Sequence, residues 1–241
     1  MIMLEEQLQE ILKRFPELKL SKRVNDIVLA GVLNIDCYYE KLDERIIDKF
    51  NVQIIIPEAF PKKLPIVREV GKKIPLKYGH IYSDGELCLA TDQEIRITLG
   101  YDINLYEWLD KFVIPYFYSF KIWQKTGKFP FGERPHFVKG IIEFYKEYLL
   151  LNDLSKIINV LKYIYNKGDL NGYCRCPCGS GRSINECFHQ EKLKELSKIN
   201  IKDDLYYIYW YFNKINGKRK KPIIYPLTLE NFNKLYGIKN K

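Results

Sequence analysis

No segment of the sequence is apolar over the length that a bilayer requires. The uninterrupted apolar run around Ile27–Leu33 is one of the longest, and a membrane-spanning helix needs roughly 18 or more such residues. The N-terminus also lacks a basic stretch followed by an apolar one, so we do not expect a secretory leader. Repeats and low-complexity segments are missing as well. These absences predict a cytoplasmic protein.

The composition excludes further classes of protein. Of the 241 residues, 46% are apolar and 29% are charged. These fractions are ordinary for a globular protein, and they argue against a disordered chain, a collagen and a disulfide-stabilised miniprotein. The length is sufficient for one large domain or two small ones, with a buried core.

Charge and cysteine are both unevenly distributed along the chain. Residues 1–150 contain 22 basic and 22 acidic residues, whereas residues 151–241 contain 17 basic and 8 acidic ones, so the last part carries the whole net charge of +9. Four of the six cysteines lie between Cys174 and Cys187. A neutral part followed by a basic, cysteine-rich part predicts modules with different partners. We expect a first domain over 1–150, a connecting helix and linker over 151–172, and a third part over 173–241.

The periodicity of apolar residues predicts an α+β fold. Helical spacing over 4–15 ends at Pro16, and two stretches rich in β-branched residues, Ile27–Ile35 and Arg45–Ile56, predict antiparallel strands. The prolines between Pro57 and Pro75 exclude a helix there. Helical patterns return only after this segment, and strands followed by helices are typical of the α+β class. The later helices are expected around 105–112, 137–150, 154–165 and 191–198.

Two sequence blocks surround a cysteine that stands apart from the cluster. The first block, 56–67, has prolines four positions apart, and the second, 80–89, contains the turn Ser83-Asp84-Gly85 followed by Cys88. Together they resemble the ubiquitin-conjugating enzyme family, whose pattern combines a proline-rich strand, a His-Pro-Asn segment, a glycine-containing turn and a catalytic Cys-Leu pair. The residues that match are Pro57, Phe60, Pro61, Pro65, Val67, Asp84, Gly85, Cys88 and Leu89.

The resemblance implies both a fold and a reaction. The fold would be ubiquitin-conjugating-like, with an N-terminal helix, an antiparallel meander and C-terminal helices. Cys88 would receive a ubiquitin-like modifier from an activating enzyme, hold it as a thioester and pass it to an amine of a target protein. This chemistry suits a thiolate, because a thioester remains reactive toward amines. Bacterial relatives of the family often accompany antiviral defence systems.

His80 occupies the position where the family has its asparagine. An imidazole N–H can stabilise the tetrahedral oxyanion in place of an amide, or the ring can remove the proton of the attacking amine. Both roles stay open for His80. Asp92 and Asp102 are further candidates for orienting an amine. The loop 131–136 could fold over the site and supply an acid or base, although a surface loop is the favoured interpretation. Cys37 has no motif around it and is expected to be structural.

The cysteine cluster predicts a metal site. Cys176, Cys178, Cys187 and His189 follow the pattern C-x-C-x8-C-x-H, and two thiolates, a Gly-Ser-Gly turn and a returning Cys/His pair can close a tetrahedron around Zn²⁺. The core Cys-Pro-Cys-Gly-Ser-Gly resembles the SEC-C motif, a small zinc element of many bacterial proteins. Because Phe188 separates the last two ligands, Cys174 is an alternative fourth ligand. Four protein ligands would leave no position for a reacting water, so the zinc would be structural and not catalytic. The role we expect for such a module is to recruit a target or another partner.

The C-terminal residues leave two other functions open. An aromatic run, 206–212, precedes Lys218, Arg219, Lys220 and Lys221. Basic and aromatic residues together can bind single-stranded nucleic acid, or the aromatics can simply pack on neighbouring helices. The alternatives to a conjugating enzyme are therefore a nucleic-acid-associated zinc protein and a catalytically inactive binding scaffold of the same fold.

Overall fold

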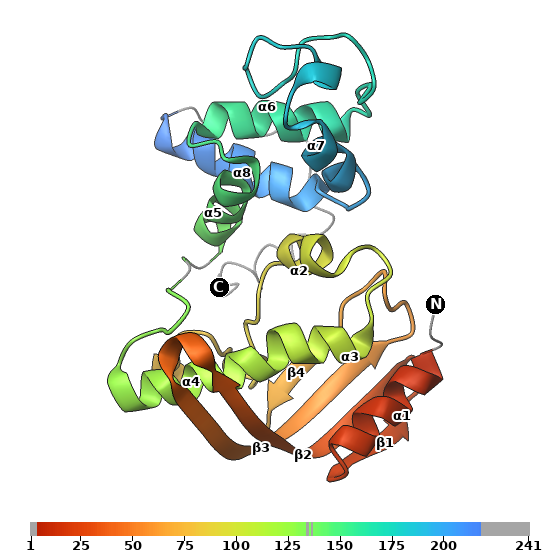
Figure 1. Ribbon diagram of the computed structural model, residues 1–241, viewed down its shortest axis with the longest axis vertical. Helices are drawn as coiled ribbons and strands as arrows, with labels where there is room; N and C mark the ends of the chain where they lie inside the picture. Colours follow the sequence, from red (N-terminus) through yellow and green to blue (C-terminus); the bar gives the residue numbers. More distant parts are fainter. Residues whose placement is uncertain (1–3, 134, 136, 218–241) are drawn as a thin grey trace, which may run out of the picture. The chain divides into compact units, whose positions relative to one another are not determined.

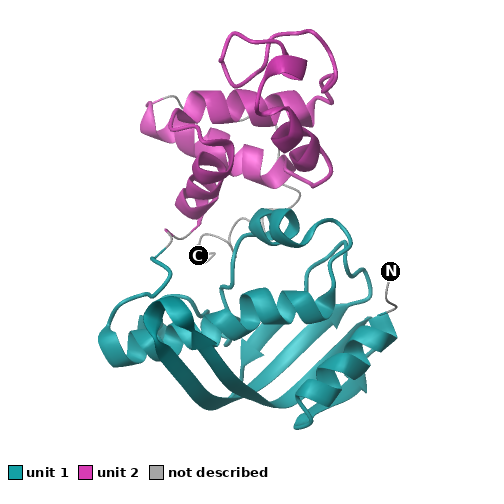
Figure 2. Cartoon of the chain, viewed as in Figure 1, with its two compact units in different colours: residues 1–133 teal, residues 134–241 magenta. Residues whose placement is uncertain are grey.

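The structure, a computed structural model, describes residues 4–133, 135 and 137–217. The chain forms two compact units, residues 1–133 and residues 134–241 (Figures 1 and 2). The first unit contains a sheet with helices, and the described part of the second is helical apart from its loops. The predicted α+β class is confirmed. None of the helices in the described ranges combines the length and the apolar character needed to cross a bilayer.

The first unit begins with a helix and an antiparallel meander. Its four strands pair in chain order, β1-β2-β3-β4, as neighbouring antiparallel pairs. The two predicted strands are β2 and β3, and they pair along their whole length from Asp26–Pro57 to Tyr39–Glu44. The elements are α1 (Leu4–Arg14), β1 (Leu18–Lys22), β2 (Asp26–Tyr39), β3 (Glu44–Pro57) and β4 (Ile66–Glu69).

The core of this unit lies between one face of the sheet and the helices that follow it. Along β3, Phe50, Val52, Ile54 and Ile56 alternate with more exposed residues, as expected for a strand with one buried face. Figure 1 shows α3 and α4 running across this face, and Phe117 packs on Phe50 with ring centroids 4.3 Å apart. The remaining helices are α2 (Asp92–Leu99), α3 (Leu105–Trp108) and α4 (Ile114–Thr126).

The helical path continues through Pro115 instead of ending before it. Residues Leu109–Val113 form a π-helical turn between α3 and α4, and the proline follows at the beginning of α4, where its missing N–H is tolerated. The wider turn makes room for the proline ring next to the preceding carbonyl groups. The helical path therefore continues to Thr126, far past the expected stretch around 105–112.

The second unit consists of α5 (Val138–Leu149), α6 (Leu154–Tyr165), α7 (Gln190–Ser197) and α8 (Lys202–Ile215). α5 packs against α6 and α8, and α6 also packs against α7 and α8. The division between the units falls at residues 133 and 134, whereas the sequence predicts a boundary at 150. The reason is that the apolar face of α5, with the buried Phe144, Tyr145 and Leu149, is covered by the later helices. α6 is a core helix of this unit.

Candidate active site and candidate metal centre

Cys88 lies on a β-hairpin that adds to the sheet edge at β4. Ile81 pairs with Leu87 in antiparallel register, the Cys88 N–H donates to the His80 carbonyl at 2.9 Å, and the Tyr82 N–H donates to the Glu86 carbonyl at 2.8 Å. His80 and Cys88 are therefore directly opposite each other. Because side chains alternate between faces and Ile81 and Leu87 are buried in the core, His80 and Cys88 share the other face.

The turn of this hairpin requires glycine. Gly85 has φ +83, and its N–H donates to the Tyr82 carbonyl at 3.0 Å. This is the three-residue loop in which a left-handed residue ends a tight turn. The Gly85 carbonyl in turn accepts the Glu69 N–H at 2.9 Å, which places the turn beside β4. A Cβ on Gly85 would lie 2.6 Å from the Glu69 carbonyl oxygen.

We expect Gly85→Ala to destabilise the first unit more than Gly127→Ala. Both glycines are left-handed, but nothing lies within 4 Å of a Cβ added to Gly127. The control should therefore lose about 1–2 kcal/mol from backbone strain alone. Gly85→Ala should lose roughly 1–3 kcal/mol more, because the backbone of Glu69 cannot move aside as a flexible side chain would. Denaturant unfolding of the two variants measures the difference, and equal losses would show that the turn is not pressed against β4.

The Cys88 thiol is half-buried, so it is less accessible than a thiol standing free at a loop. The Tyr82 side chain lies on the same face of the hairpin as this thiol. Burial raises the pKa of the thiol, hydrogen bonding by Tyr82 lowers it, and the nearby Glu86 carboxylate raises it. The free thiol is therefore protonated near neutral pH, and its reactivity depends on which of these neighbours prevails.

His80 is held both by its backbone and by its ring. Its carbonyl accepts the Tyr116 hydroxyl at 2.8 Å as well as the Cys88 N–H. Its imidazole makes edge contacts with Tyr78 and Phe129, at centroid distances of 5.4 and 5.0 Å. The hairpin register thus brings the two predicted catalytic residues together, while aromatic packing restricts how the imidazole can move.

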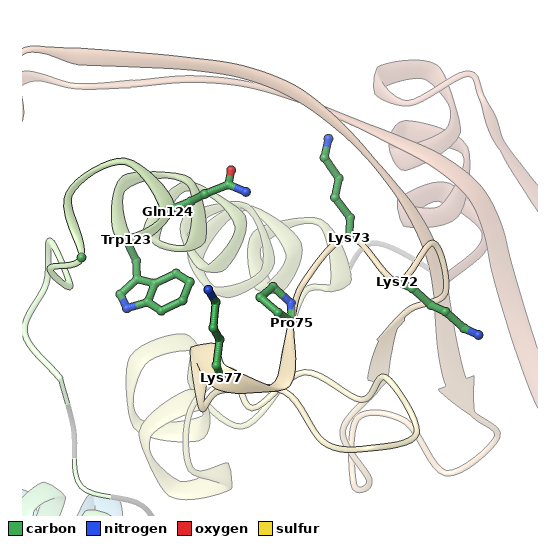
Figure 3. Close-up of a pocket in the computed structure, with 7 residues that line it drawn as sticks. Lys72, Lys73, Pro75, Lys77, Trp123 and Gln124 are labelled. Atoms are coloured by element: carbon green, nitrogen blue, oxygen red, sulfur yellow. The ribbon is translucent and has the colours of Figure 1, made fainter.

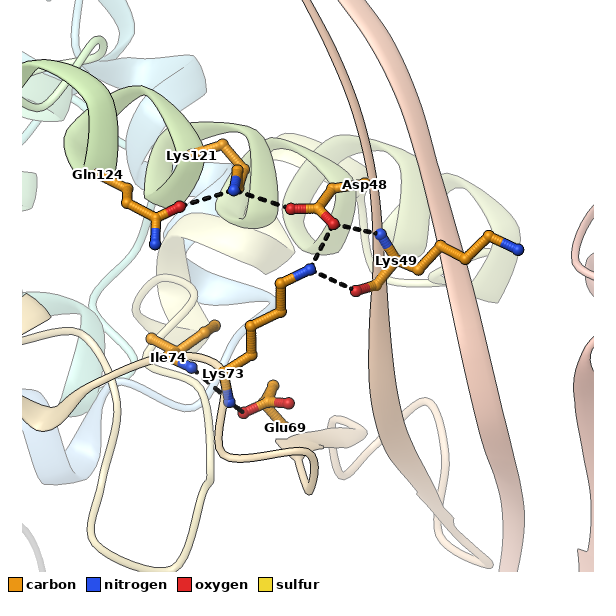
Figure 4. Close-up of polar contacts among 7 residues, drawn as sticks. All are labelled: Asp48, Lys49, Glu69, Lys73, Ile74, Lys121 and Gln124. Atoms are coloured by element: carbon orange, nitrogen blue, oxygen red, sulfur yellow. Dashed lines mark hydrogen bonds and ion pairs between the residues drawn. The ribbon is translucent and has the colours of Figure 1, made fainter.

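A polar network holds the segment that leads from β4 to this hairpin (Figure 4). The buried Glu69 carboxylate accepts the N–H groups of Gly71 and Lys73 at 2.8 and 2.9 Å. The Lys73 ammonium reaches the Asp48 carboxylate and the Lys49 carbonyl. Although partial burial opposes ionisation, the ammonium groups of Lys73 and Lys121 lower the pKa of Asp48 to about 2. The carboxylate is therefore charged at neutral pH and ties both lysines to β3.

A cleft of about 480 Å³ lies between this segment and α4. Figure 3 shows the side chains of Pro75, Lys77 and Trp123 gathered around it. Cys88 and His80 are not among its lining residues, so the cleft is separate from the hairpin. The lining comprises Lys72, Lys73, Pro75, Lys77, Trp123, Gln124 and Gly127.

The other candidate residues of the first unit lie apart or cannot be placed. Asp92 begins α2, Asp102 lies in the following turn, and both are exposed. In the loop 131–136, positions 134 and 136 are outside the described residues. Cys37 on β2 packs against the core, and burial raises its pKa to about 11, which is the environment of a structural thiol.

The second unit brings four potential metal ligands together. The ligand atoms of Cys176, Cys178, Cys187 and His189 all lie within 4.8 Å of one another, and the four residues are buried. The Cys178 and Cys187 sulfurs are 3.6 Å apart, and the Cys187 sulfur lies 3.5 Å from His189 Nδ1. A zinc tetrahedron with bonds of about 2.3 Å to sulfur and about 2.0–2.1 Å to nitrogen has edges of roughly 3.8 and 3.6 Å. The donor set and its spacing therefore fit a tetrahedral ion.

The loop that carries the first two cysteines is shaped by glycine. Gly179 and Gly181 both have positive φ, at +79 and +77. They let the chain turn sharply after Cys178, and the Cys176 N–H then meets the Arg182 carbonyl at 2.8 Å. This short hairpin presents both sulfurs to one side. His189 lies at the start of α7, where its carbonyl accepts the Leu193 N–H at 2.9 Å.

The imidazole of His189 is oriented by a backbone group outside the cluster. Its Nε2 lies 2.6 Å from the Leu149 carbonyl oxygen, and since a carbonyl can only accept, Nε2 must carry the proton. Nδ1 is then left with a lone pair that faces the sulfurs, which is the usual arrangement of a metal-binding histidine. Cys174, the alternative ligand, is exposed and lies 3.0 Å from the Tyr163 hydroxyl instead.

The aromatic run before the basic residues, 206–212, forms the middle of α8. Tyr207 is buried there, and Lys162 and Lys214 lie over the rings of Tyr209 and Trp210. These rings therefore take part in helix packing. The basic residues Lys218, Arg219, Lys220 and Lys221 lie outside the described part of the chain.

Comparison with known proteins finds no family model that matches this chain. It also finds no curated protein with significant similarity to it. The assignment of function therefore depends on the two centres described above.

Proposed function

We propose that the protein is a ubiquitin-like-protein conjugating enzyme with a structural zinc site in its C-terminal unit. The observation that carries the proposal is the hairpin that pairs His80 with Cys88. It follows a helix and a four-stranded meander and precedes helices, in the order that the resemblance to ubiquitin-conjugating enzymes implies. The half-buried thiol and the adjacent imidazole supply a nucleophile and a group that can donate or accept a proton.

The reaction consists of two acyl transfers. In the first, the Cys88 sulfur loses its proton and attacks the thioester carbonyl of a modifier that is attached to an activating enzyme. A new carbon–sulfur bond forms, and the thiol of the activating enzyme leaves with a proton. In the second, an amine of the target attacks, the carbon–sulfur bond breaks as a carbon–nitrogen bond forms, and the amine proton returns to Cys88. His80 either donates to the oxyanion or takes up the amine proton on the way.

Zinc is the ion we propose for the cluster of Cys176, Cys178, Cys187 and His189. Three thiolates and one imidazole favour zinc among the common divalent ions, and four protein ligands leave no position for a reacting water. The metal would stabilise the unit that recruits a target or another partner. Residues 151–241 carry the whole net charge of +9, which favours a partner with an acidic surface.

The test is the formation of a covalent adduct. The full chain, incubated with its cognate activating enzyme, ATP and a ubiquitin-like modifier, should gain the mass of one modifier, and a thiol reductant should remove it. Cys88→Ala should form no adduct, whereas Cys37→Ala, which changes the other thiol of the same unit, should charge like the native chain. An adduct that survives in Cys88→Ala would place the reaction on a different residue.

A binding scaffold is the second candidate, and one observation favours it. Burial raises the pKa of the Cys88 thiol, so the resting thiol is less reactive than that of a typical catalytic cysteine. A scaffold would bind the modifier without a covalent bond and with equal affinity in the native chain and in Cys88→Ala. Calorimetry of both proteins with the free modifier, together with the adduct assay, separates a scaffold from an enzyme.

A further inference from the structure

The sulfur of Cys88 has a neighbour that the motif resemblance does not identify. Tyr82 lies two residues after His80 on the same strand of the hairpin, opposite Glu86. Side chains two positions apart share a face, so Tyr82 points to the side that carries His80 and Cys88. Its position is diagonal to Cys88 across the hairpin, a separation that a long aromatic side chain can bridge. The Tyr82 phenol and the Cys88 thiol are close enough for each to affect the pKa of the other.

We propose that Tyr82 is a catalytic residue of this centre, whose hydroxyl donates a hydrogen bond to the Cys88 sulfur and stabilises its thiolate form. The role in acyl transfer rests on the proposed conjugating function, whereas the hydrogen bond itself does not. Tyr82 is suited to this role because a phenol O–H remains a donor over the whole neutral range, and a bond to a charged acceptor is stronger than one between neutral groups. The side chain is 40% exposed, so an incoming modifier can still approach.

Other groups around the sulfur act in the opposite direction or through the backbone. Glu86 faces Cys88 on the same side of the hairpin and disfavours the thiolate by its charge. Arg68 lies 3.9 Å from the Glu86 carboxylate and compensates for part of that charge. The Tyr116 hydroxyl donates to the carbonyl of His80. Among these neighbours, Tyr82 is the side chain whose hydrogen bond lowers the pKa of the thiol, against the effect of burial.

The same hydrogen bond has a place in each acyl transfer. Before the first transfer it stabilises the attacking thiolate, so that a larger fraction of the protein is ready to react. In the second transfer Cys88 is the leaving group, and negative charge returns to the sulfur as the carbon–sulfur bond breaks. A hydrogen-bond donor that is already positioned at the sulfur stabilises this charge, and no side chain has to rearrange during the reaction. Tyr82 therefore acts on the sulfur, whereas His80 would act on the oxyanion or on the amine proton.

The contact can be tested without a modifier. Iodoacetamide reacts with thiolates, and peptide mapping by mass spectrometry gives the rate at Cys88 separately from the other cysteines. At pH 8, Tyr82→Phe should react at least about threefold more slowly than the native chain, because one charge-assisted hydrogen bond is lost. The pH at which the reaction accelerates should also rise. Glu86→Gln should shift the profile in the opposite direction, and Tyr101→Phe, at an exposed tyrosine of the same unit, should not shift it.

Three results would be informative. A profile for Tyr82→Phe that matches the native one, together with faster alkylation of Tyr82→Ala, would overturn the proposal, because Tyr82 would then only cover the sulfur. A shifted profile with slower charging and slower discharge would support it fully. A shifted profile in a protein that never forms the modifier adduct would support the hydrogen bond and overturn the conjugating function, so the two failures are distinguishable.

Discussion

Cys178→Ser should release the metal and unfold the C-terminal unit, whereas Cys174→Ser should do neither. The sulfur of Cys178 is buried and lies 3.6 Å from that of Cys187, so its loss leaves three ligands and an opened cluster. Cys174 is exposed and touches Tyr163. The two variants make the same chemical change four residues apart. Elemental analysis should give about one zinc per chain for the native protein and for Cys174→Ser, and close to none for Cys178→Ser.

The unfolding should extend beyond the loop that holds the cysteines. His189 joins the cluster to the last residue of α5 through its hydrogen bond with the Leu149 carbonyl. Without a metal, two thiols, the new hydroxyl and an imidazole remain buried close together, and binding free energy that would stabilise the fold is lost. Hydrogen exchange should therefore become faster in α5 and α7 of Cys178→Ser, while the sheet of the first unit keeps its protection. Zinc bound at full stoichiometry in Cys178→Ser would contradict the ligand assignment.

The four potential metal ligands could be predicted only in part from the sequence pattern. The spacing of Cys176, Cys178 and Cys187 around a Gly-Ser-Gly turn was enough to predict three of the four potential ligands that the structure brings together, because the turn allows only a narrow range of backbone paths. The fourth ligand could not be chosen in this way, since Cys174 and His189 are both within reach along the chain. The choice depends on burial and on a carbonyl of α5, forty positions earlier. Such a tertiary contact has no signal in the local sequence.

The boundary between the two units depends on which helices cover α5. The helix predicted over 137–150 exists as α5, and its apolar face was visible in the sequence. An amphipathic pattern states that one face is buried but not which element covers it. The helices of the second unit cover this face, so α5 belongs there. The antiparallel strands β2 and β3 could be predicted from their β-branched residues. The continuation of the helix past Pro115 could not, because it depends on a π-helical turn.

The neighbours of Cys88 were only partly predictable. The residues Ser83-Asp84-Gly85 predict a turn, and a tight hairpin around it pairs residues that are equally distant from the turn. Extending that rule by two more positions would have placed His80 opposite Cys88 and Tyr82 beside them. The half-burial of the sulfur could not be obtained from the motif, because it depends on the tertiary packing around the hairpin. Reactivity is thus set by surroundings that lie outside the motif.

The most discriminating experiment on the reaction replaces His80 by Asn and by Ala. After single-turnover charging of Cys88, the rate at which the thioester is lost to free lysine is measured for each variant. If His80 donates to the oxyanion, His80→Asn should discharge near the native rate, because an amide N–H can take the place of the imidazole N–H. His80→Ala should then be slower by roughly 10²–10³, the effect of removing one such donor. If His80 instead removes the amine proton, Asn cannot replace it and both variants should be slow.

Two further variants make this result interpretable. Cys88→Ser should form an oxygen ester that resists both reductant and lysine, which shows that charging takes place at residue 88. His80→Phe preserves the edge contacts with Tyr78 and Phe129 but has no donor or base, so it separates the chemistry of the imidazole from its packing. We expect it to charge normally and to discharge as slowly as His80→Ala. Native discharge in His80→Phe would show that the ring only supports the hairpin, and that the transfer depends on the other groups around the sulfur.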